Sequence, residues 1–307
     1  MVHVQKKLTE SIDMFNIEGI LVVSEPMWRH TTFAVGGPAD YYAVPSGEED
    51  LRILLTSAAR SGIDSFIIGG GSNLLVSDAG IRGLVIDTRR FDEFRTEDGL
   101  LILGAGLPVS DAAWRAGSAG LGGFDFLFGM PGSVGGALWM NARCYGAEVA
   151  GVLEWMDVMD DEGRVRRMPA DPGAWGYKRS PLQEGGLTVL RAAFRTVKDD
   201  PAALRAAMKE RRDDREAKGH YRAPCAGSAF KNDRSFGAPS GALVDRCGLK
   251  GHRIGGAAVS PWHGNIVVND RGADAADILQ LLEEVAAAVE NETGHRMERE
   301  VLLVGEW

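Results

Sequence analysis

Two glycine-rich stretches are the first places where this chain could bind a ligand: "IIGGGSNLLV" at 67–76 and "GMPGSVGGALWMNARCYG" at 129–146. Successive glycines after a strand leave backbone N–H groups free to converge on an anion such as a phosphate. In the second stretch, Gly132 and Ser133 can begin a helix whose exposed N–H groups suit the same ligand. The alternative is that both stretches form tight turns and close helix packing. In each stretch, the glycines are followed by an apolar segment with a buried-looking Asn, Asn73 and Asn141, and this favours the ligand site.

Neither stretch matches a standard phosphate-binding motif. The chain contains no GxxxxGK[ST], and neither stretch has the order strand, GxGxxG, helix, so P-loop and Rossmann sites are excluded. Cys144, Cys225 and Cys247 are an odd number without CxxC spacing, which argues against a disulfide framework and a zinc site. We therefore expect no metal.

Polar residues in two further segments could take part in acid–base or charge-stabilising chemistry. In "AWGYKRSPL" at 174–182, Lys178 follows an aromatic pair and is either a surface charge or a catalytic cation. In "PCAGSAFKND", Ser228 has a hydroxyl that is a poor acid by itself and needs a positive neighbour, for which Lys231 is a candidate. By its local sequence alone, Ser228 is better explained as a turn or capping serine. From its position alone, Lys218 is explained as a charge at the end of a helix.

Alternating apolar runs, caps and turn residues predict the elements that must position these groups. We expect the first thirty residues to form a helix and a connector. Ser46 and Glu49 form a capping box for a helix that ends at Gly62, and Ser110 is the N-cap of another helix. Strands are expected at 39–45, on both sides of the first glycine stretch, and at 100–107.

The second half of the chain continues with a hairpin and a change in composition. Asp161, Glu162 and Gly163 provide the turn of a hairpin over 154–169, and a strand follows at 187–197. Asp200 and Pro201 begin a strong helix. Beyond it we expect a loop with Ser228, an amphipathic helix and a final strand; further strands are expected near 253–260 and 265–269.

Composition describes an ordinary soluble protein with unusual glycine content. The chain has 307 residues, of which 40 are glycines, against a usual share of ~7%. A net charge of −9 argues against binding to nucleic acid or to an anionic membrane. The N-terminus lacks the apolar core of a signal peptide, and no run approaches the ~18 apolar residues of a membrane helix. We expect a cytoplasmic monomer.

Six motifs, in order along the chain, resemble those of the UDP-N-acetylenolpyruvoylglucosamine reductase family. They are "TTFAVGGPADY", "IIGGGSNLLV", "GMPGSVGGALWMNARCYG", "AGSAFKN", "CGLKGHRIGGAAVS" and "HGNIVVN", and the resemblance covers about residues 28–305. The chain resembles the shorter branch of the family. The resemblance implies an α+β fold: a two-subdomain FAD-binding unit of the vanillyl-alcohol-oxidase type plus a C-terminal α/β substrate-binding domain. Boundaries near 90 and 200 fit composition and resemblance alike, giving flavin subdomains at 1–90 and 91–200 and a substrate domain at 201–307.

The resemblance also implies a reaction and a site. The family's enzymes use NADPH and FAD to reduce UDP-N-acetylglucosamine enolpyruvate to UDP-N-acetylmuramate for peptidoglycan. Ser228 matches the family's proton donor and Glu300 its C-terminal glutamate. The implied substrate contacts are Tyr177, Lys218, Lys231 and Asn232, whereas His263 is expected to be structural. The implied flavin contacts are Gly69, Gly70, Gly71, Ser72, Asn73, Leu74, Gly129, Met130, Pro131, Gly132, Ser133 and Asn141.

Three departures from the family pattern leave alternatives open. Lys178 stands where the family's G-Y-R-x-S has an arginine that stabilises the enol, and lysine lacks the planar fork that grips a carboxylate. Lys218-Gly219-His220 replaces Lys-Gln-Pro, and "KND" at 231–233 replaces Lys-Asn-Pro. Lys178 does the arginine's work at some loss of rate, or Arg179 substitutes for it. Otherwise the chain is a flavin-binding relative with another substrate, or a non-catalytic UDP-sugar-binding protein.

Overall fold

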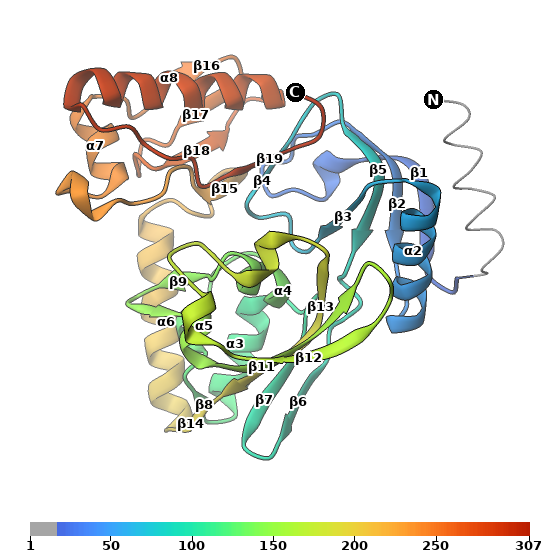
Figure 1. Ribbon diagram of the computed structural model, residues 1–307. Helices are drawn as coiled ribbons and strands as arrows, with labels where there is room; N and C mark the ends of the chain where they lie inside the picture. Colours follow the sequence, from blue (N-terminus) through green and yellow to red (C-terminus); the bar gives the residue numbers. More distant parts are fainter. Residues whose placement is uncertain (1–16) are drawn as a thin grey trace. The chain divides into compact units, whose positions relative to one another are not determined.

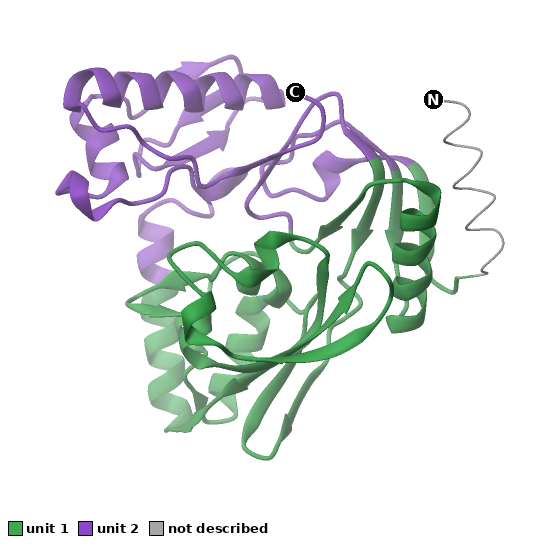
Figure 2. Cartoon of the chain, in the orientation of Figure 1, with its two compact units in different colours: residues 1–23, 41–70, 83–212 green, residues 24–40, 71–82, 213–307 purple. Residues whose placement is uncertain are grey.

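A computed structural model describes residues 17–307, which divide into two compact units (Figure 2). Unit 1 takes in the chain up to residue 23 together with 41–70 and 83–212, and unit 2 takes in 24–40, 71–82 and 213–307. The helix predicted at the N-terminus falls largely outside the described residues. The connector predicted after it is wrong in part, because strand β1 (Ile20–Pro26) and a 3-10 turn (Met27–Arg29) occupy that place (Figure 1).

A four-stranded sheet has the order β1-β2-β5-β3. Its other strands are β2 (Pro38–Val44), β3 (Ser65–Ile68) and β5 (Ile81–Asp87), and they confirm the strands predicted around the first glycine stretch. Strands β3 and β5 are parallel, with Ile68 opposite Asp87. Both strands therefore end at one edge of the sheet, where the glycines of residues 69–71 begin.

Helix α2 (Glu48–Ser61) begins and ends through local signals, one of which the sequence misassigned. The predicted capping box with Glu49 is wrong: Gly47 is the N-cap, and the Ser46 hydroxyl and N–H both donate to Asp50 Oδ2, at 2.7 and 2.9 Å. Asp50, rather than Glu49, accepts from Ser46, because its carboxylate is also held by a hydrogen bond from the Glu18 N–H. The helix stops at Gly62 as predicted, in the left-handed conformation that glycine adopts at no steric cost.

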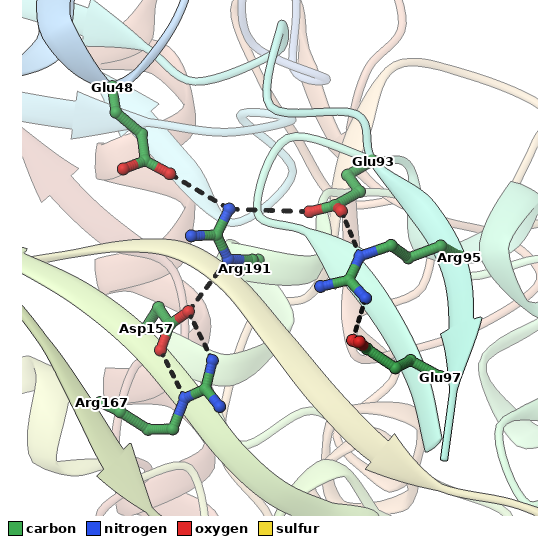
Figure 3. A network of polar contacts seen from close by, with 7 residues as sticks. All are labelled: Glu48, Glu93, Arg95, Glu97, Asp157, Arg167 and Arg191. Atoms are coloured by element: carbon green, nitrogen blue, oxygen red, sulfur yellow. Dashed lines mark hydrogen bonds and ion pairs between the residues drawn. The ribbon is translucent and has the colours of Figure 1, made fainter. Parts of the chain in front are cut away.

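An antiparallel five-stranded sheet, ordered β12-β11-β13-β7-β6, forms the centre of the next segment of unit 1. Its strands include the predicted hairpin, and their bounds are β6 (Phe94–Glu97), β7 (Leu100–Gly104), β11 (Leu153–Asp160), β12 (Val165–Pro169) and β13 (Leu187–Arg195). The buried Asp157 accepts from Arg167 Nε at 2.8 Å and from Arg191 Nε at 2.9 Å (Figure 3). Arg191 also forms ion pairs with Glu48 and Glu93. Ion pairs therefore connect the three neighbouring strands β12, β11 and β13.

The helices of this segment lie between the strands in sequence. They are α3 (Val109–Ser118), α4 (Val134–Trp139), α5 (Val149–Val152) and α6 (Pro201–Ala217), with short strand pairs β9 (Arg143–Cys144) with β10 (Ala147–Glu148) and β8 (Leu121–Gly122) with β14 (Val197–Lys198). Asp200 accepts from the N–H groups of Ala202 and Ala203, which confirms the predicted start of α6. The predicted Ser110 cap is wrong, because Pro108 precedes α3 and Ser110 lies inside it.

In unit 2, a sheet ordered β15-β18-β17-β16 is accompanied by two helices. The strands are β15 (Cys225–Ser228), β16 (Arg253–Ile254), β17 (Ala257–Val259) and β18 (Ile266–Asn269), and the helices are α7 (Ser240–Arg246) and α8 (Ala275–Thr293). The single strand predicted over 253–260 is wrong, because Gly255, at a φ of +51°, turns the chain into an antiparallel pair. The final strand β19 (Leu302–Val304) pairs in parallel with β4 (Leu74–Val76).

Three hydrophobic clusters form the cores. One draws on residues between 41 and 91 with Met159 and Leu190, one on residues 101–208, and one on Phe33, Val35, Leu75 and residues 225–301. In the described part of the chain, none of the helices combines the length and the apolar character that crossing a bilayer requires. All three cysteines lie in this part and are free thiols, and no group of metal-ligating side chains gathers among residues 17–307.

Candidate functional site

The two glycine stretches meet in unit 1. We call residues 69–74 the first glycine loop and residues 129–133 the second. A Cβ atom on Gly69 would lie 2.1 Å from Ser133 Oγ, and one on Gly70 would lie 2.6 Å from Gly132 Cα. The Gly69 backbone therefore packs on the Ser133 side chain and the Gly70 backbone on that of Gly132, so a side chain at either position would require a shift.

The second loop is shaped by its own glycines and by two serines. Gly129 and Gly132 have φ angles of +78° and +109°, which side chains rarely adopt. Ser133 is the N-cap of α4 and accepts from the N–H of Gly136 at 3.3 Å. Ser110 accepts from the N–H of Gly129 at 3.0 Å, so the serine predicted as a helix cap supports the loop instead. Its partner lies far along the chain, and no local pattern signals this bond.

The remainder of the first loop, residues 71–74, belongs to unit 2 and forms its contacts within that unit. Gly71 is left-handed, at a φ of +58°, and its carbonyl accepts from the N–H of Thr32 at 3.1 Å. Asn73 Nδ2 donates to the carbonyl of Glu300 at 3.1 Å, and Leu74 pairs with Leu302. These contacts hold the segment that contains Glu300 against the first loop.

Lys178 lies in a tight turn of unit 1. The backbones of Gly176 and Arg179 exchange hydrogen bonds of 3.0 and 3.1 Å, which leaves Tyr177 and Lys178 at the tip. Lys178 has a φ of +56° and is half-buried, whereas Tyr177 and Arg179 are exposed. Its ammonium is 6.0 Å from the centre of the Tyr177 ring. Buried Asn141 donates from Nδ2 to the carbonyl of Gly176 at 2.9 Å, so the predicted flavin-binding Asn holds this turn.

Ser228 is the last residue of β15 rather than part of a loop, which corrects the prediction. It lies opposite Ile266 of β18. The residues after it are held by Asn265, whose side chain accepts from the N–H of Phe230 and donates to its carbonyl, both at 2.8 Å. Asn265 is 2% exposed and its carbonyl also accepts from Ala229. Sequence reasoning did not select Asn265, although it lies in the "HGNIVVN" motif.

The segment that contains Glu300 lies alongside the residues that follow Ser228. Its N–H donates to the carbonyl of Ala229 at 2.8 Å, and Phe230 pairs with Arg299 in an antiparallel bridge. Glu300 is only 8% exposed, whereas the Glu298 side chain is 71% exposed and forms an ion pair with Lys231, with 2.5 Å between Nζ and Oε1. Burial therefore distinguishes Glu300 from Glu298, although an extended strand would place both carboxylates on the same face. Strand β19 begins only at Leu302, so Glu300 precedes it.

Two further residues predicted to contact substrate have structural partners in unit 2. Asn232 Oδ1 accepts from the N–H of Ser240 at the start of α7, at 2.9 Å. Lys218, just beyond α6, forms an exposed ion pair with Asp214, with 2.7 Å between Nζ and Oδ2.

Two histidines lie near Lys218 along this part of unit 2. Burial, with smaller contributions from Arg215 and His263, lowers the pKa of His220 to about 4. Burial also lowers the pKa of His263, and Lys218 and Lys250 add to the effect. The two rings lie 6.0 Å apart, and His263 Nδ1 accepts from the N–H of Asn265 at 3.1 Å. His263 therefore supports the Asn265 backbone as a neutral ring.

The glycine loops suit a flavin diphosphate. The chain is acidic overall, so backbone N–H groups must supply much of the positive potential for two phosphates. Helix α4 has six residues and adds little dipole. The loops pack closely at Gly69, against the Ser133 side chain, and at Gly70, against the Gly132 backbone. With left-handed glycines in the second loop, they present main chain rather than side chains to a ligand. The residues present therefore fit FAD.

Comparison with known proteins identifies both parts of the chain. Residues 39–169 match a family described as "FAD binding domain", and residues 219–304 match "UDP-N-acetylenolpyruvoylglucosamine reductase, C-terminal domain". The reductase of Heliobacterium modesticaldum is 40% identical over 292 residues, covering 95% of this chain and 93% of its own. That of Pelobacter propionicus is 40% identical over 292 residues, covering 95% and 98%. The crystal structure of the reductase from Thermus caldophilus has 32% identity and a TM-score of 0.79, covering 94% and 99%.

Proposed function

Because the chain belongs to the UDP-N-acetylenolpyruvoylglucosamine reductase family, we propose that Ser228, Glu300 and Lys178 perform that family's chemistry in this protein. The protein is an FAD-dependent oxidoreductase with an α+β fold of the vanillyl-alcohol-oxidase type. It reduces UDP-N-acetylglucosamine enolpyruvate to UDP-N-acetylmuramate in peptidoglycan precursor synthesis, with NADPH as the reductant.

The chain's residues must meet the charge that reduction creates on the substrate. When bound, FAD supplies hydride that originates from NADPH. Hydride at the β-carbon of the enol ether leaves negative charge on the α-carbon and its carboxylate, and this charge needs a nearby cation or hydrogen-bond donor. Lys178 provides the cation. We assign the buried Glu300 to stabilisation of the intermediate, as the family match implies.

Ser228 gives the proton that the α-carbon takes up. The observation that supports this pairing best is the 2.8 Å hydrogen bond from the N–H of Glu300 to the carbonyl of Ala229, next to Ser228. It sets the buried carboxyl group and the hydroxyl on adjacent backbone segments. Lys231 is paired with Glu298, so its ammonium acts on Ser228 only if that ion pair opens.

The remaining assignments divide by unit. In unit 1, we assign flavin binding to Gly69 and Gly70, to the second glycine loop and to Asn141, and substrate contact to Tyr177. In unit 2, we assign flavin binding to the rest of the first loop: Gly71, Ser72, Asn73 and Leu74. Lys218, Lys231 and Asn232 are assigned to the UDP-sugar. We also propose three domains at 1–90, 91–200 and 201–307, because each of the three hydrophobic clusters draws most of its residues from one of these ranges. A cytoplasmic monomer completes the proposal, and sizing chromatography tests the oligomeric state.

An optical experiment on the purified protein tests this function. We expect the visible spectrum of bound flavin and NADPH oxidation that depends on UDP-N-acetylglucosamine enolpyruvate. Flavin with no substrate-dependent oxidation would contradict the assignment and favour a flavoprotein with another substrate or a UDP-sugar-binding protein. A protein that takes up no FAD would contradict the cofactor site itself.

A further inference from the structure

The turn that carries Lys178 adopts a conformation that its own sequence does not favour. Lys178 occupies the left-handed region at a φ of +56°, which glycine and asparagine adopt far more readily than lysine. Such a residue persists only where the surroundings determine its backbone, and observed outliers of this kind concentrate at functional sites. Other groups of unit 1 must therefore hold the Lys178 backbone in this conformation.

Three side chains hold the turn, and we call them the turn clamp: Asn141, Ser180 and Gln183. Gln183 Nε2 donates to the carbonyl of Lys178 at 3.0 Å and to the carbonyl of Trp139 at 2.7 Å. The Ser180 hydroxyl donates to the same Trp139 carbonyl at 2.8 Å. Asn141 donates to Gly176, at the start of the turn.

Trp139 links the clamp to the proposed flavin site. It is the last residue of α4, whose N-cap is Ser133 of the second glycine loop. The Gln183 amide therefore joins the residue that ends this helix to the backbone of Lys178 itself. Of the three clamp residues, only Gln183 bonds Lys178 directly, by the hydrogen bonds that the structure records within residues 17–307.

We propose that Gln183 is a positioning residue for the reduction of the enolpyruvyl substrate: it fixes the left-handed backbone of Lys178 and so directs the Lys178 ammonium. This inference rests on the proposed role of Lys178. A lysine is a point charge on a flexible four-carbon stem and lacks the preorganised fork of an arginine. Fixing the backbone removes part of that freedom. A catalytic cation must be held in place in this way.

Rapid-mixing measurement of the two half-reactions tests the inference. In Gln183→Met, which keeps the side chain's length but removes both N–H donors, we expect flavin reduction by NADPH to stay at the wild-type rate. Reoxidation of the reduced flavin by UDP-N-acetylglucosamine enolpyruvate should slow by roughly 10- to 100-fold, as a misplaced catalytic group does. Gln280→Met, on the exposed face of α8, is the matched control and should change neither rate.

A double-mutant cycle separates positioning from general damage. If Gln183 acts through Lys178, Gln183→Met should slow reoxidation little further once Lys178→Met is present, since the two effects are not additive. Additive losses would show that Gln183 acts elsewhere and would overturn the inference. Should Gln183→Met fail to fold, Gln183→Glu serves as the second variant. Its carboxylate keeps the amide's shape but cannot donate, so the same selective loss is expected.

Failure of this inference and failure of the proposed function give different results. If Lys178→Met is slow but Gln183→Met and Gln183→Glu reoxidise at the wild-type rate, the Gln183 inference is wrong and the role of Lys178 stands. If Lys178→Met itself is as fast as wild type, the proposed role of Lys178 is wrong, and with it the positioning role of Gln183.

Discussion

At the scale of single residues, Lys178 is the position where this chain differs most pointedly from its family's pattern. The sequence raised the question of whether Lys178 is a surface charge, and the structure shows it half-buried at the tip of a turn, with Arg179 exposed beside it. The two side chains lie at different exposures, which favours Lys178 over Arg179 as the cation of the site.

Lys178→Arg should raise the rate of substrate reduction. An arginine restores two parallel hydrogen bonds to the substrate carboxylate and keeps the positive charge. A gain of about 1 kcal/mol in the transition state corresponds to a rate increase of roughly fivefold. Steady-state turnover with the enolpyruvyl substrate measures it, and Arg179→Lys is the control that should change nothing. A slower Lys178→Arg enzyme would mean that the turn is adapted to the lysine.

Ser228→Ala should separate the two half-reactions. We expect the reduction of the enolpyruvyl substrate to fall by about 10²- to 10⁴-fold, because a positioned proton donor is lost. Flavin reduction by NADPH should be retained. Rapid-mixing absorbance measures both steps, and Ser235→Ala, an exposed serine nearby in sequence, is the control. Equal rates of substrate reduction in Ser228→Ala and wild type would assign the proton to another group.

At the scale of elements, the two glycine loops depend on backbone contact rather than on side chains. Gly70 lies against Gly132, and this contact brings together two segments that are far apart in the sequence. The strands β3 and β5 deliver the first loop to one sheet edge, and α4 follows the second.

Gly70→Ala should weaken FAD binding. Its Cβ would lie 2.6 Å from Gly132 Cα, so one loop must move. Overpacking of this kind costs about 1–3 kcal/mol, which raises the dissociation constant of FAD by roughly 5- to 150-fold. Flavin fluorescence titration of apoprotein measures it. Gly151→Ala is the control, because a Cβ at that glycine meets no atom within 4 Å. Unchanged affinity in Gly70→Ala would show that the loop contact does not shape the flavin site.

Asp157 joins three strands of the five-stranded sheet, and its loss should destabilise the fold (Figure 3). Burial raises the pKa of Asp157, but hydrogen bonds from Arg167 and Arg191 outweigh it and hold the pKa below its usual range. Asp157→Asn should lower the free energy of unfolding by about 1.5–3 kcal/mol, measured by chemical denaturation at pH 7. Glu162→Gln removes an exposed pair with Arg164 and should cost at most about 1 kcal/mol. Equal effects would mean that the Asp157 pair is no more than a surface contact.

At the scale of the whole molecule, acid should destabilise the protein before its carboxylates titrate. The pKa of His220 falls from 6.5 in the unfolded chain to about 4 in the folded protein. Between these values the unfolded chain binds more protons, so stability is lost as pH falls from about 6.5 to 4 and no further from this group below that. The loss is up to about 3 kcal/mol.

Chemical denaturation at pH 7 and pH 5 measures this effect. His220→Gln should flatten the dependence, whereas His252→Gln, on an exposed ring, should leave it as in wild type. The carboxylate of Asp157 adds a loss only below about pH 4, because a depressed carboxyl pKa stabilises the folded state above that range. A protein equally stable at pH 5 and pH 7 would mean that His220 is solvated in solution.

The sequence by itself determined the elements whose signals lie within a few residues. Gly62 ends α2, Asp200 and Pro201 begin α6, and Gly163 turns the hairpin, each through bonds to near neighbours in the chain. Ordered motifs also identified the family and its cofactor. Even local signals failed where two acceptors competed, as Glu49 and Asp50 did for Ser46, because neighbouring carboxylates are equivalent until the surrounding fold is known.

Tertiary structure alone decided which of these elements meet. It brought Gly70 onto Gly132, bound Asn73 to the backbone of Glu300 across 227 positions, and buried Glu300 while leaving Glu298 in solvent. It also turned Ser110 from a helix cap into a support of the second glycine loop. Such contacts depend on how entire cores pack, and no local spacing records a partner that only the folded chain brings near.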